Sequence, residues 1–281
     1  MSTSSQTYKD LAIPHFKEVF DVVDRVMHKL GMPYYLIGAT AIALELLKKG
    51  SKPFRGTRDI DFAIMVSSIE GYEHLTQELL AVGFCKHKAP WTFYWETNRA
   101  VIDFLPFGEI EQNEIVQFHK RYSDLHVLGL KEVLASPEEI PIEEKIAHIP
   151  SLPGMVILKL VAWSDRPEER AHDLMDILKI IERYFEHAYD EITEFHFDTF
   201  LQDSEEEFDQ LKIAAEVLGR KAREYLNQSL TLSERINHVI GTNLVQSEHS
   251  PIARRWASER GWELNYALDI MGAFQKGLHI I

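Results

Sequence analysis

The chain has 281 residues, of which 45% are hydrophobic, and a formal net charge of −14. This length allows one large or two modest domains with a sizeable core. The acidic balance argues against broad, non-specific nucleic-acid binding, although not against a local basic groove. The single cysteine, Cys85, excludes internal disulfides and cysteine-based zinc sites. Because no signal-peptide pattern and no membrane-length apolar run is found, we expect a soluble, cytoplasmic protein without a membrane partner.

The first half of the chain mixes predicted helices and strands, which apolar spacing and breaker residues delimit. Gly31, Gly50 and Gly83 end the three helices, and 97–99 joins the last two long strands as a hairpin. In chain order we predict a helix over 8–30, a strand over 34–37, a helix over 39–49, a strand over 59–66, a helix over 69–82, strands over 91–96 and 100–107, and a short strand over 126–130.

After Pro153 the pattern becomes helical, and Pro167 is well placed to begin the second of these helices. The predicted helices cover 154–163, 168–184, 198–219, 232–240, 251–260 and 263–277. The sequence therefore predicts an α+β protein. A mixed α/β domain would occupy 1–150, and a mostly helical domain would occupy 151–281.

Two carboxylates, Asp59 and Asp61, stand one residue apart at the start of a predicted strand. Residues i and i+2 of a strand point to the same face, so both can aim at one point. Neighbouring carboxylates repel unless a positive charge lies between them. Hard oxygen ligands on an open platform suit Mg²⁺, which binds through one or two carboxylates plus substrate phosphates.

A candidate phosphate site precedes this pair, where Gly38 follows a strand and opens a helix. The first N–H groups of a helix have no internal partner and attract anions. Gly38 and Ala39 are small enough to let a phosphate approach, and Thr40 could cap the helix or touch the phosphate. Such a junction is weak on its own, since most are structural.

A third carboxylate, Asp103, lies inside the apolar strand predicted over 100–107. An acid in such a strand is costly unless it is paired, protonated or metal-bound. If its strand neighbours that of Asp61, all three carboxylates converge. Asp103 could then act as general base on an attacking hydroxyl, or as a further metal ligand.

These motifs resemble the DNA polymerase β-like nucleotidyltransferase superfamily, whose members carry a small-residue pair after the first strand, a DxD and often a third Asp. Here they read Gly38-Ala39, Asp59-Ile60-Asp61 and Asp103. Ala39 departs from the usual Gly or Ser of the pair. The resemblance implies a nucleotidyltransferase-fold mixed sheet with flanking helices, and a catalytic metal platform of Asp59, Asp61 and Asp103 with Mg²⁺ as cofactor.

A narrower resemblance, to the AbiEii/AbiGii-type toxin nucleotidyltransferases, spans roughly 34–184. It rests on Gly38-Ala39-Thr40-Ala41-Ile42-Ala43-Leu44, on Arg55-Gly56-Thr57-Arg58-Asp59-Ile60-Asp61, on a helical Lys159 and on Arg170-Ala171-His172-Asp173-Leu174-Met175-Asp176, with His172 where the motif has Lys. It implies a nucleoside triphosphate held by Gly38, Ala39, Thr40, Arg58 and Lys159. It further implies a hydroxyl acceptor, with RNA and tRNA among the candidates, and an antitoxin as a candidate partner.

The later motifs allow several roles. Lys159 lies in a mostly apolar helix and needs an anionic partner, which could be nucleotide phosphate or a structural carboxylate. Asp173 and Asp176 lie near one helix face. They could bond the nucleotide, position Lys159 or pair with Arg170; we favour a functional role for Asp173 and a structural one for Asp176.

Nucleotidyl transfer is the leading hypothesis, and two alternatives stay open. One is a catalytically silent nucleotide-binding or interaction module with the same fold. The other is an antibiotic-modifying nucleotidyltransferase, since an acidic protein would suit cationic aminoglycosides. Trp91, Phe93 and Trp95 alternate along a predicted strand, where core packing is the default and base stacking the minority interpretation.

Overall fold

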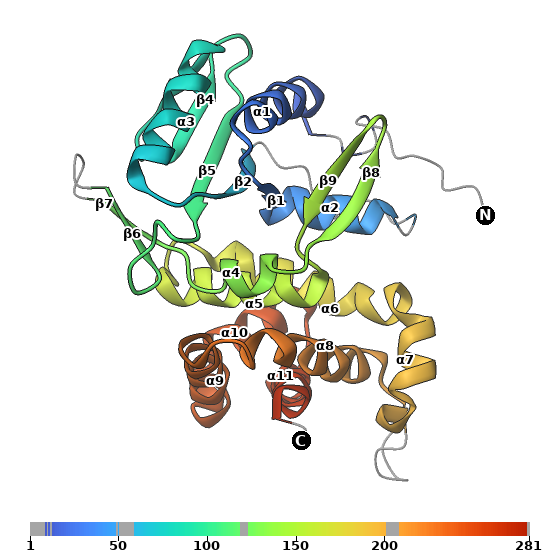
Figure 1. The fold of residues 1–281 in the computed structure, drawn as a ribbon. Helices are drawn as coiled ribbons and strands as arrows, with labels where there is room; N and C mark the ends of the chain where they lie inside the picture. Colours follow the sequence, from blue (N-terminus) through green and yellow to red (C-terminus); the bar gives the residue numbers. More distant parts are fainter. Residues whose placement is uncertain are drawn as a thin grey trace. The chain divides into compact units, whose positions relative to one another are not determined.

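The fold is described from a computed structural model, which covers residues 9, 11, 13–48, 50, 59–118, 123–200 and 208–279. The chain divides into two compact units, Met1–Ser151 and Leu152–Ile281. The first unit contains a mixed sheet with helices and the second is helical (Figure 1). The predicted α+β class with a helical C-terminal region is therefore confirmed.

The elements of the first unit follow one another closely along the chain. They are α1 (Phe16–Leu30), β1 (Tyr34–Ile37), α2 (Gly38–Lys48), β2 (Asp59–Met65), α3 (Ile69–Ala81), β3 (Phe84–Lys86), β4 (Thr92–Trp95), β5 (Val101–Phe107), β6 (Ile115–Phe118), β7 (Ser123–His126), α4 (Leu130–Leu134), β8 (Glu138–Ile142) and β9 (Lys145–Ile149). Five strands form one sheet in the order β1-β2-β5-β4-β3, while β6–β7 and β8–β9 are separate two-stranded sheets. Within the five-stranded sheet, β2 and β5 pair in parallel and the other neighbours pair antiparallel.

One face of the five-stranded sheet carries the aromatic core of the first unit. Phe62 of β2 and Phe104 of β5 stack with ring centroids 5.6 Å apart, and Phe93 of β4 meets Phe104 edge-on. Tyr72 of α3 donates a hydrogen bond to the Phe104 carbonyl oxygen at 3.0 Å. Because side chains alternate between faces along a strand, the residues between these aromatic positions point to the other side of the sheet.

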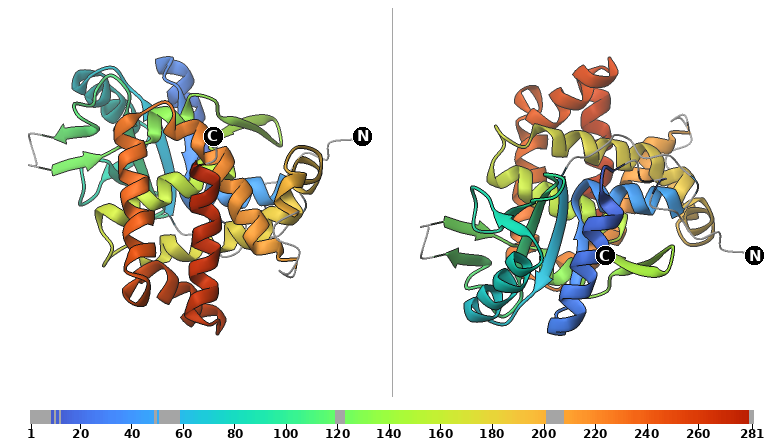
Figure 2. Two further views of the ribbon diagram at one scale, coloured as in Figure 1. Left: turned by 90° about the horizontal axis from the view of Figure 1, so that it is seen from below. Right: turned by 90° about the horizontal axis from the view of Figure 1, so that it is seen from above.

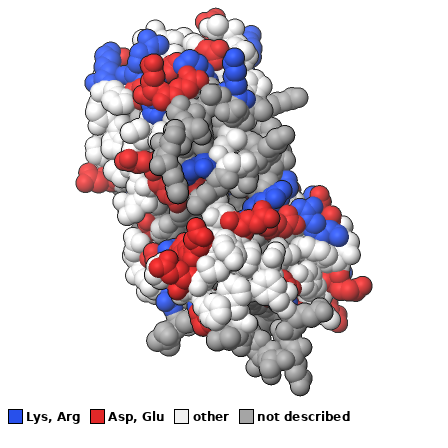
Figure 3. Space-filling model, turned by 90° about the vertical axis from the view of Figure 1, so that its right-hand side faces the viewer, with Lys and Arg blue, Asp and Glu red and all other residues white. Residues whose placement is uncertain are grey.

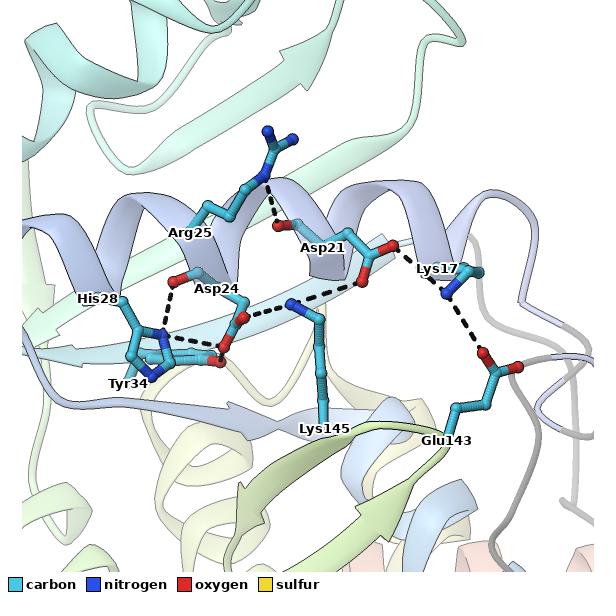
Figure 4. A network of polar contacts seen from close by, with 8 residues as sticks. All are labelled: Lys17, Asp21, Asp24, Arg25, His28, Tyr34, Glu143 and Lys145. Atoms are coloured by element: carbon cyan, nitrogen blue, oxygen red, sulfur yellow. Dashed lines mark hydrogen bonds and ion pairs between the residues drawn. The ribbon is translucent and has the colours of Figure 1, made fainter.

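Ion pairs tie the β8–β9 hairpin to α1 (Figure 4). Lys145 of β9 donates to Asp24 of α1, and Tyr34 donates to the same carboxylate at 2.5 Å. Lys17 pairs with Glu143 at the hairpin turn, at 3.2 Å. Burial alone would raise the pKa of Asp24, but the hydrogen bonds from Lys145 and Tyr34 outweigh it and lower that pKa. The hairpin is therefore fixed by a charged clamp.

The second unit is built from helices (Figures 1 and 2). They are α5 (Leu152–Asp165), α6 (Ala171–His187), α7 (Tyr189–Phe195), η1 (Phe197–Phe200), α8 (Gln210–Leu226), α9 (Leu230–Val245), η2 (Ser247–His249), α10 (Pro251–Arg260) and α11 (Leu264–His279). Helices α8 and α11 pack backbone to backbone. A Cβ atom on Gly277 would lie 2.1 Å from the Glu216 carbonyl oxygen, and one on Gly219 would lie 2.2 Å from that of Phe274. Only glycine allows this crossing.

Several predicted elements differ from the structure. The helix predicted over 8–30 begins only at Phe16. The strand predicted over 126–130 is wrong, because β7 ends at His126 and Gly129, with φ 91°, leads into α4. Pro167 does not begin a helix, since it lies in the turn in which the Arg166 carbonyl accepts the Arg170 N–H. The helix predicted over 198–219 begins only at Gln210, and residues 201–207 lie outside the described part.

Candidate active site

Three aspartates lie on one face of the five-stranded sheet. Asp61 of β2 is the register partner of Asp103 of β5, and Asp59 is that of Val101. Partners on adjacent strands point to the same face, as do residues two apart on one strand, so Asp59, Asp61 and Asp103 all face away from the Phe62–Phe104 stack. Asp59 is exposed, whereas Asp61 and Asp103 are half-buried.

The junction between β1 and α2 lies against this carboxylate row. Ile37, the last residue of β1, is the register partner of Asp61. Gly38 opens α2 with φ +65°, and a Cβ atom built on it would lie 2.3 Å from the Asp61 Oδ2 atom. Glycine is therefore required here both for its left-handed backbone and for the space that the Asp61 carboxylate fills.

The other two residues of the candidate phosphate site, Ala39 and Thr40, are less accessible to solvent than that description suggests. Ala39 is half-buried, while Thr40 is fully buried. No described residue accepts from or donates to the Thr40 hydroxyl. The small side chains that the sequence predicts at this helix start are thus next to the carboxylates, but the Thr40 hydroxyl is turned away from solvent.

The negative charge of Asp103 affects a titratable group on the opposite face of the sheet, the Tyr72 phenol. Burial raises the pKa of the Tyr72 phenol on the aromatic side of the sheet, and the negative charge of Asp103 raises it further. Among the described residues, no three His, Cys, Asp or Glu side chains are arranged to hold one metal ion. Two carboxylates in register nevertheless fit Mg²⁺, which commonly completes its shell with water and substrate phosphates.

A second charged cluster lies in the helical unit, between α5 and α6. The Lys159 ammonium donates to Asp173 Oδ1 at 2.9 Å and to Asp176 Oδ2 at 2.8 Å. Arg170 adds a bond to Asp173 Oδ2 at 3.1 Å. Burial would lower the pKa of Lys159, but the charges and hydrogen bonds of the two aspartates outweigh it and raise that pKa. Asp173 thus bonds both Lys159 and Arg170, two of the partners considered for it.

The basic residues around the aspartate pair are only partly described. Lys48 pairs with Glu138 at 2.7 Å and lies 3.7 Å from Glu45. Arg58, expected to bind the nucleotide, lies outside the described residues, as do Lys49, Lys52 and Arg55. On the face in Figure 3, acidic and basic side chains intermingle, and no continuous basic tract is formed by the residues described there.

The aromatic strand β4 divides its side chains between two environments. Phe93 is fully buried, Trp95 stacks on Phe84, and Trp91 contacts Phe118, so this face packs into the core as expected by default. Thr92 and Tyr94 point to the other face, because Thr92 is the register partner of Asp103. Sequence reasoning missed Tyr94; the alternation along 92–95, combined with the hairpin, was the signal that could have found it.

Comparison with known proteins gives one family. The family described as "Nucleotidyl transferase AbiEii toxin, Type IV TA system" matches residues 22–239. No curated protein matches. Within the described residues, no helix has the length and apolarity needed to cross a membrane.

Solved structures give distant likenesses. An antigenic nucleotidyltransferase-like protein from Paracoccidioides brasiliensis is 14% identical, with a TM-score of 0.41 over 69% of this chain and 92% of its own. ANT(2″)-Ia in complex with adenylyl-2″-tobramycin is 14% identical, with a TM-score of 0.38 over 53% and 77%. The Thermotoga maritima CCA-adding enzyme complexed with tRNA is 14% identical, with a TM-score of 0.32 over 98% and 66%. At these scores the family match alone carries the identification.

Proposed function

This chain belongs to the AbiEii family of nucleotidyl transferases, and we propose that the aspartate row of its first unit is the site of the transfer. The observation that carries the proposal is the pairing of Asp61 with Asp103 in register, with Gly38 packed against the Asp61 carboxylate. A carboxylate platform and an anion-attracting helix start lie side by side there. Together they can bind the phosphates of a nucleoside triphosphate and its Mg²⁺.

The proposed reaction is an in-line displacement at the α-phosphorus. The acceptor hydroxyl oxygen bonds to the α-phosphorus while the bond to the bridging oxygen breaks, and pyrophosphate leaves with that electron pair. Asp103 takes the hydroxyl proton as general base on one carboxylate oxygen, which leaves its other oxygen for a metal ion. The start of α2 at Gly38 and Ala39 orients the phosphates through backbone N–H groups.

Asp61 and Asp103, with Asp59 beside them, would hold Mg²⁺. Bound there, the ion would neutralise charge that develops on the α-phosphate and on the leaving pyrophosphate. Carboxylate oxygens are its preferred protein ligands, and the half-burial of Asp61 and Asp103 leaves room for water and phosphate ligands.

For the second unit we propose that Lys159 contacts phosphate, with Asp173 and Asp176 as its positioning residues. An ammonium has three N–H donors, and two are used by these aspartates. Its raised pKa keeps it charged at neutral pH. The third donor is the one available for an anion.

We propose an RNA hydroxyl, with tRNA included in that class, as the acceptor, and an antitoxin as the partner. The toxin description of the family supports an acceptor that belongs to the cell. An aminoglycoside, which is not a cell constituent, fits that description less well. Arg58 stays a proposed nucleotide contact.

The test incubates the full chain with Mg²⁺ and each α-labelled nucleoside triphosphate, together with either total RNA or an aminoglycoside panel. We expect label in RNA, strongly reduced by Asp61→Asn and Asp103→Asn and unaffected by Asp124→Asn, which alters an exposed carboxylate on β7. Label on aminoglycosides would favour the antibiotic-modifying alternative. Nucleotide binding without transfer to any acceptor would favour the silent module.

A further inference from the structure

We infer that Tyr94 and Arg99, on the β4–β5 hairpin, form a stacking site for a nucleobase of a single-stranded nucleic-acid acceptor. This inference rests on the proposed function. The Arg99 guanidinium carbon lies 4.9 Å from the centroid of the Tyr94 ring, over its face. Aromatic rings and guanidinium planes are the surfaces on which proteins stack unpaired bases.

Strand register places Tyr94 beside the aspartate row. Tyr94 of β4 is the register partner of Val101 on β5, and Val101 is the partner of Asp59 on β2. These three residues therefore point to one face of the sheet. Two strand spacings separate Tyr94 from Asp59, which is about 10 Å, within reach of a base next to the reacting nucleotide. Tyr94 is half-buried, with Arg99 over its ring and the His87 ring edge-on to it at 6.2 Å between centroids.

The order of strands decides which substrate reaches Tyr94. The helix start at Gly38 follows β1, on one side of β2, whereas Asp103 and then Tyr94 follow on the other side. In an in-line displacement the attacking and leaving oxygens lie on opposite sides of the phosphorus. With the leaving pyrophosphate toward Gly38, the acceptor hydroxyl approaches from the β5–β4 side. Tyr94 therefore belongs to the acceptor rather than to the triphosphate.

Arg99 is one of five described non-glycine residues with a left-handed backbone. Arg99 has φ 60°, a left-handed conformation that glycine adopts without cost, and its N–H bonds to the Trp95 carbonyl at 2.8 Å to close the turn. The side chain is exposed and makes no ion pair with any described residue. An arginine in a glycine position, placed over an aromatic ring, offers both a flat surface and a charge for phosphate.

Binding of a fluorescein-labelled single-stranded RNA 12-mer, measured by anisotropy, tests the inference. We expect Tyr94→Ala and Arg99→Gly each to raise Kd about tenfold, the size of one lost stacking contact. Tyr94→Phe keeps the ring and should bind as the wild type does. Wild-type protein should bind an abasic 12-mer as weakly as Tyr94→Ala binds the ordinary one.

Matched controls separate this effect from folding. Asn113 also has a left-handed φ, 51°, so Asn113→Gly relieves similar backbone strain and should leave RNA affinity unchanged. Arg99→Gly should fold at least as well as wild type in a thermal melt. Equal Kd for wild type, Tyr94→Ala and Arg99→Gly, or no binding of the 12-mer by the wild type, would overturn the inference.

Nucleotide binding distinguishes the two proposals. Titration with Mg²⁺ and a non-hydrolysable triphosphate analogue should give one affinity for wild type, Tyr94→Ala and Arg99→Gly. If Asp61→Asn leaves this affinity intact while the Tyr94 and Arg99 variants lose RNA, the proposed carboxylate site fails and the stacking site stands. If Asp61→Asn loses analogue binding while Tyr94→Ala binds RNA as the wild type does, the stacking site fails and the proposed carboxylate site stands.

Discussion

The aspartates of the two units differ in their burial and in their charged neighbours. In the first unit Asp61 and Asp103 stand side by side in strand register and are only half-buried. In the second unit Asp173 and Asp176 are buried and share one ammonium, Lys159, at 2.9 and 2.8 Å. The first arrangement gathers negative charge on one face of a sheet. The second places one positive ammonium between two negative carboxylates.

We infer that the first cluster serves the proposed chemistry alone, and that the second stabilises the fold in addition to its proposed phosphate contact through Lys159. Neighbouring carboxylates oppose each other's ionisation, and a protein gains nothing in stability by placing them together. A buried ammonium between two carboxylates, by contrast, leaves uncompensated charge if any member is removed. We therefore expect changes in the first cluster to reduce activity alone, and changes in the second to reduce stability as well as activity.

The largest effect is expected at Asp61. Asp61→Asn removes a charged oxygen from the proposed metal platform, and we expect transfer to fall at least about 10³-fold, or about 4 kcal/mol of transition-state stabilisation. The melting temperature should change little, because Asp61 is only half-buried. Initial rates of label transfer and a thermal melt measure both. A large drop in stability with little loss of rate would reverse the comparison.

Lys159→Met should reduce stability as well as transfer. It leaves Asp173 and Asp176 buried without their cation, and we expect a loss of about 3–5 kcal/mol in the free energy of unfolding, measured with denaturant. The control Lys212→Met breaks a more exposed pair with Asp269 and should cost under about 1 kcal/mol. Equal losses for the two variants would contradict the account.

A triple variant sharpens the same point. Replacing both aspartates with leucine in the Lys159→Met background, as Asp173→Leu and Asp176→Leu, should recover much of the lost stability, because the buried charges are then gone. Failure to recover would mean that shape rather than charge decides stability at this position.

Two glycines with the same backbone but different neighbours give a smaller effect. Gly38→Ala should destabilise by about 2 kcal/mol or more, because it combines a left-handed backbone with a clash at the Asp61 carboxylate. Gly31 has φ +64°, and no atom lies within 4 Å of the place that a Cβ would occupy, so Gly31→Ala should cost only the backbone part, about 1 kcal/mol. Only Gly38→Ala should also slow transfer. If the two variants lost the same stability and the same transfer rate, the Gly38–Asp61 contact would have no role.

The smallest effect is a pH dependence at Asp24. Its folded pKa lies below the ordinary value of 3.8, so its contribution is present above that pH and is lost as the pH falls through the folded pKa. At neutral pH the free energy of unfolding of the wild type should exceed that of Asp24→Asn by about 1 kcal/mol. Melts from pH 7 to pH 2 should show this gap closing at the acid end. A gap independent of pH would contradict the clamp.

The sequence was sufficient for the strands that carry the carboxylates. Regular apolar runs delimit 34–37, 59–66 and 100–107, and the structure has strands at all three. It was insufficient for β3, which has only three residues, and for β8, whose Glu138-Glu139-Ile140-Pro141-Ile142 contains acids and a proline. Proline and charge are depleted in strands, and here the partner strand β9 provides the pairing.

The candidate site could be predicted from the positions of residues within their strands, but not from contacts between distant segments. The positions of Asp59, Asp61 and Asp103 could be read from the strand pattern, but the register that sets Asp61 opposite Asp103 is a long-range property. Tyr94 was hidden by its neighbours, because Trp91, Phe93 and Trp95 dominate the apolar pattern of their strand. The binding of Asp173 and Asp176 to Lys159 joins two helices, which helical spacing alone does not specify.

Metal dependence tests the central claim most directly. The rate of pyrophosphate release from a nucleoside triphosphate and acceptor is titrated with Mg²⁺, for the wild type and for Asp103→Asn. The account predicts that wild-type activity saturates with Mg²⁺ and vanishes when a chelator removes it, and that Asp103→Asn stays nearly inactive at saturating Mg²⁺. Wild-type transfer that persists in chelator, or an Asp103→Asn variant as fast as wild type, would contradict it.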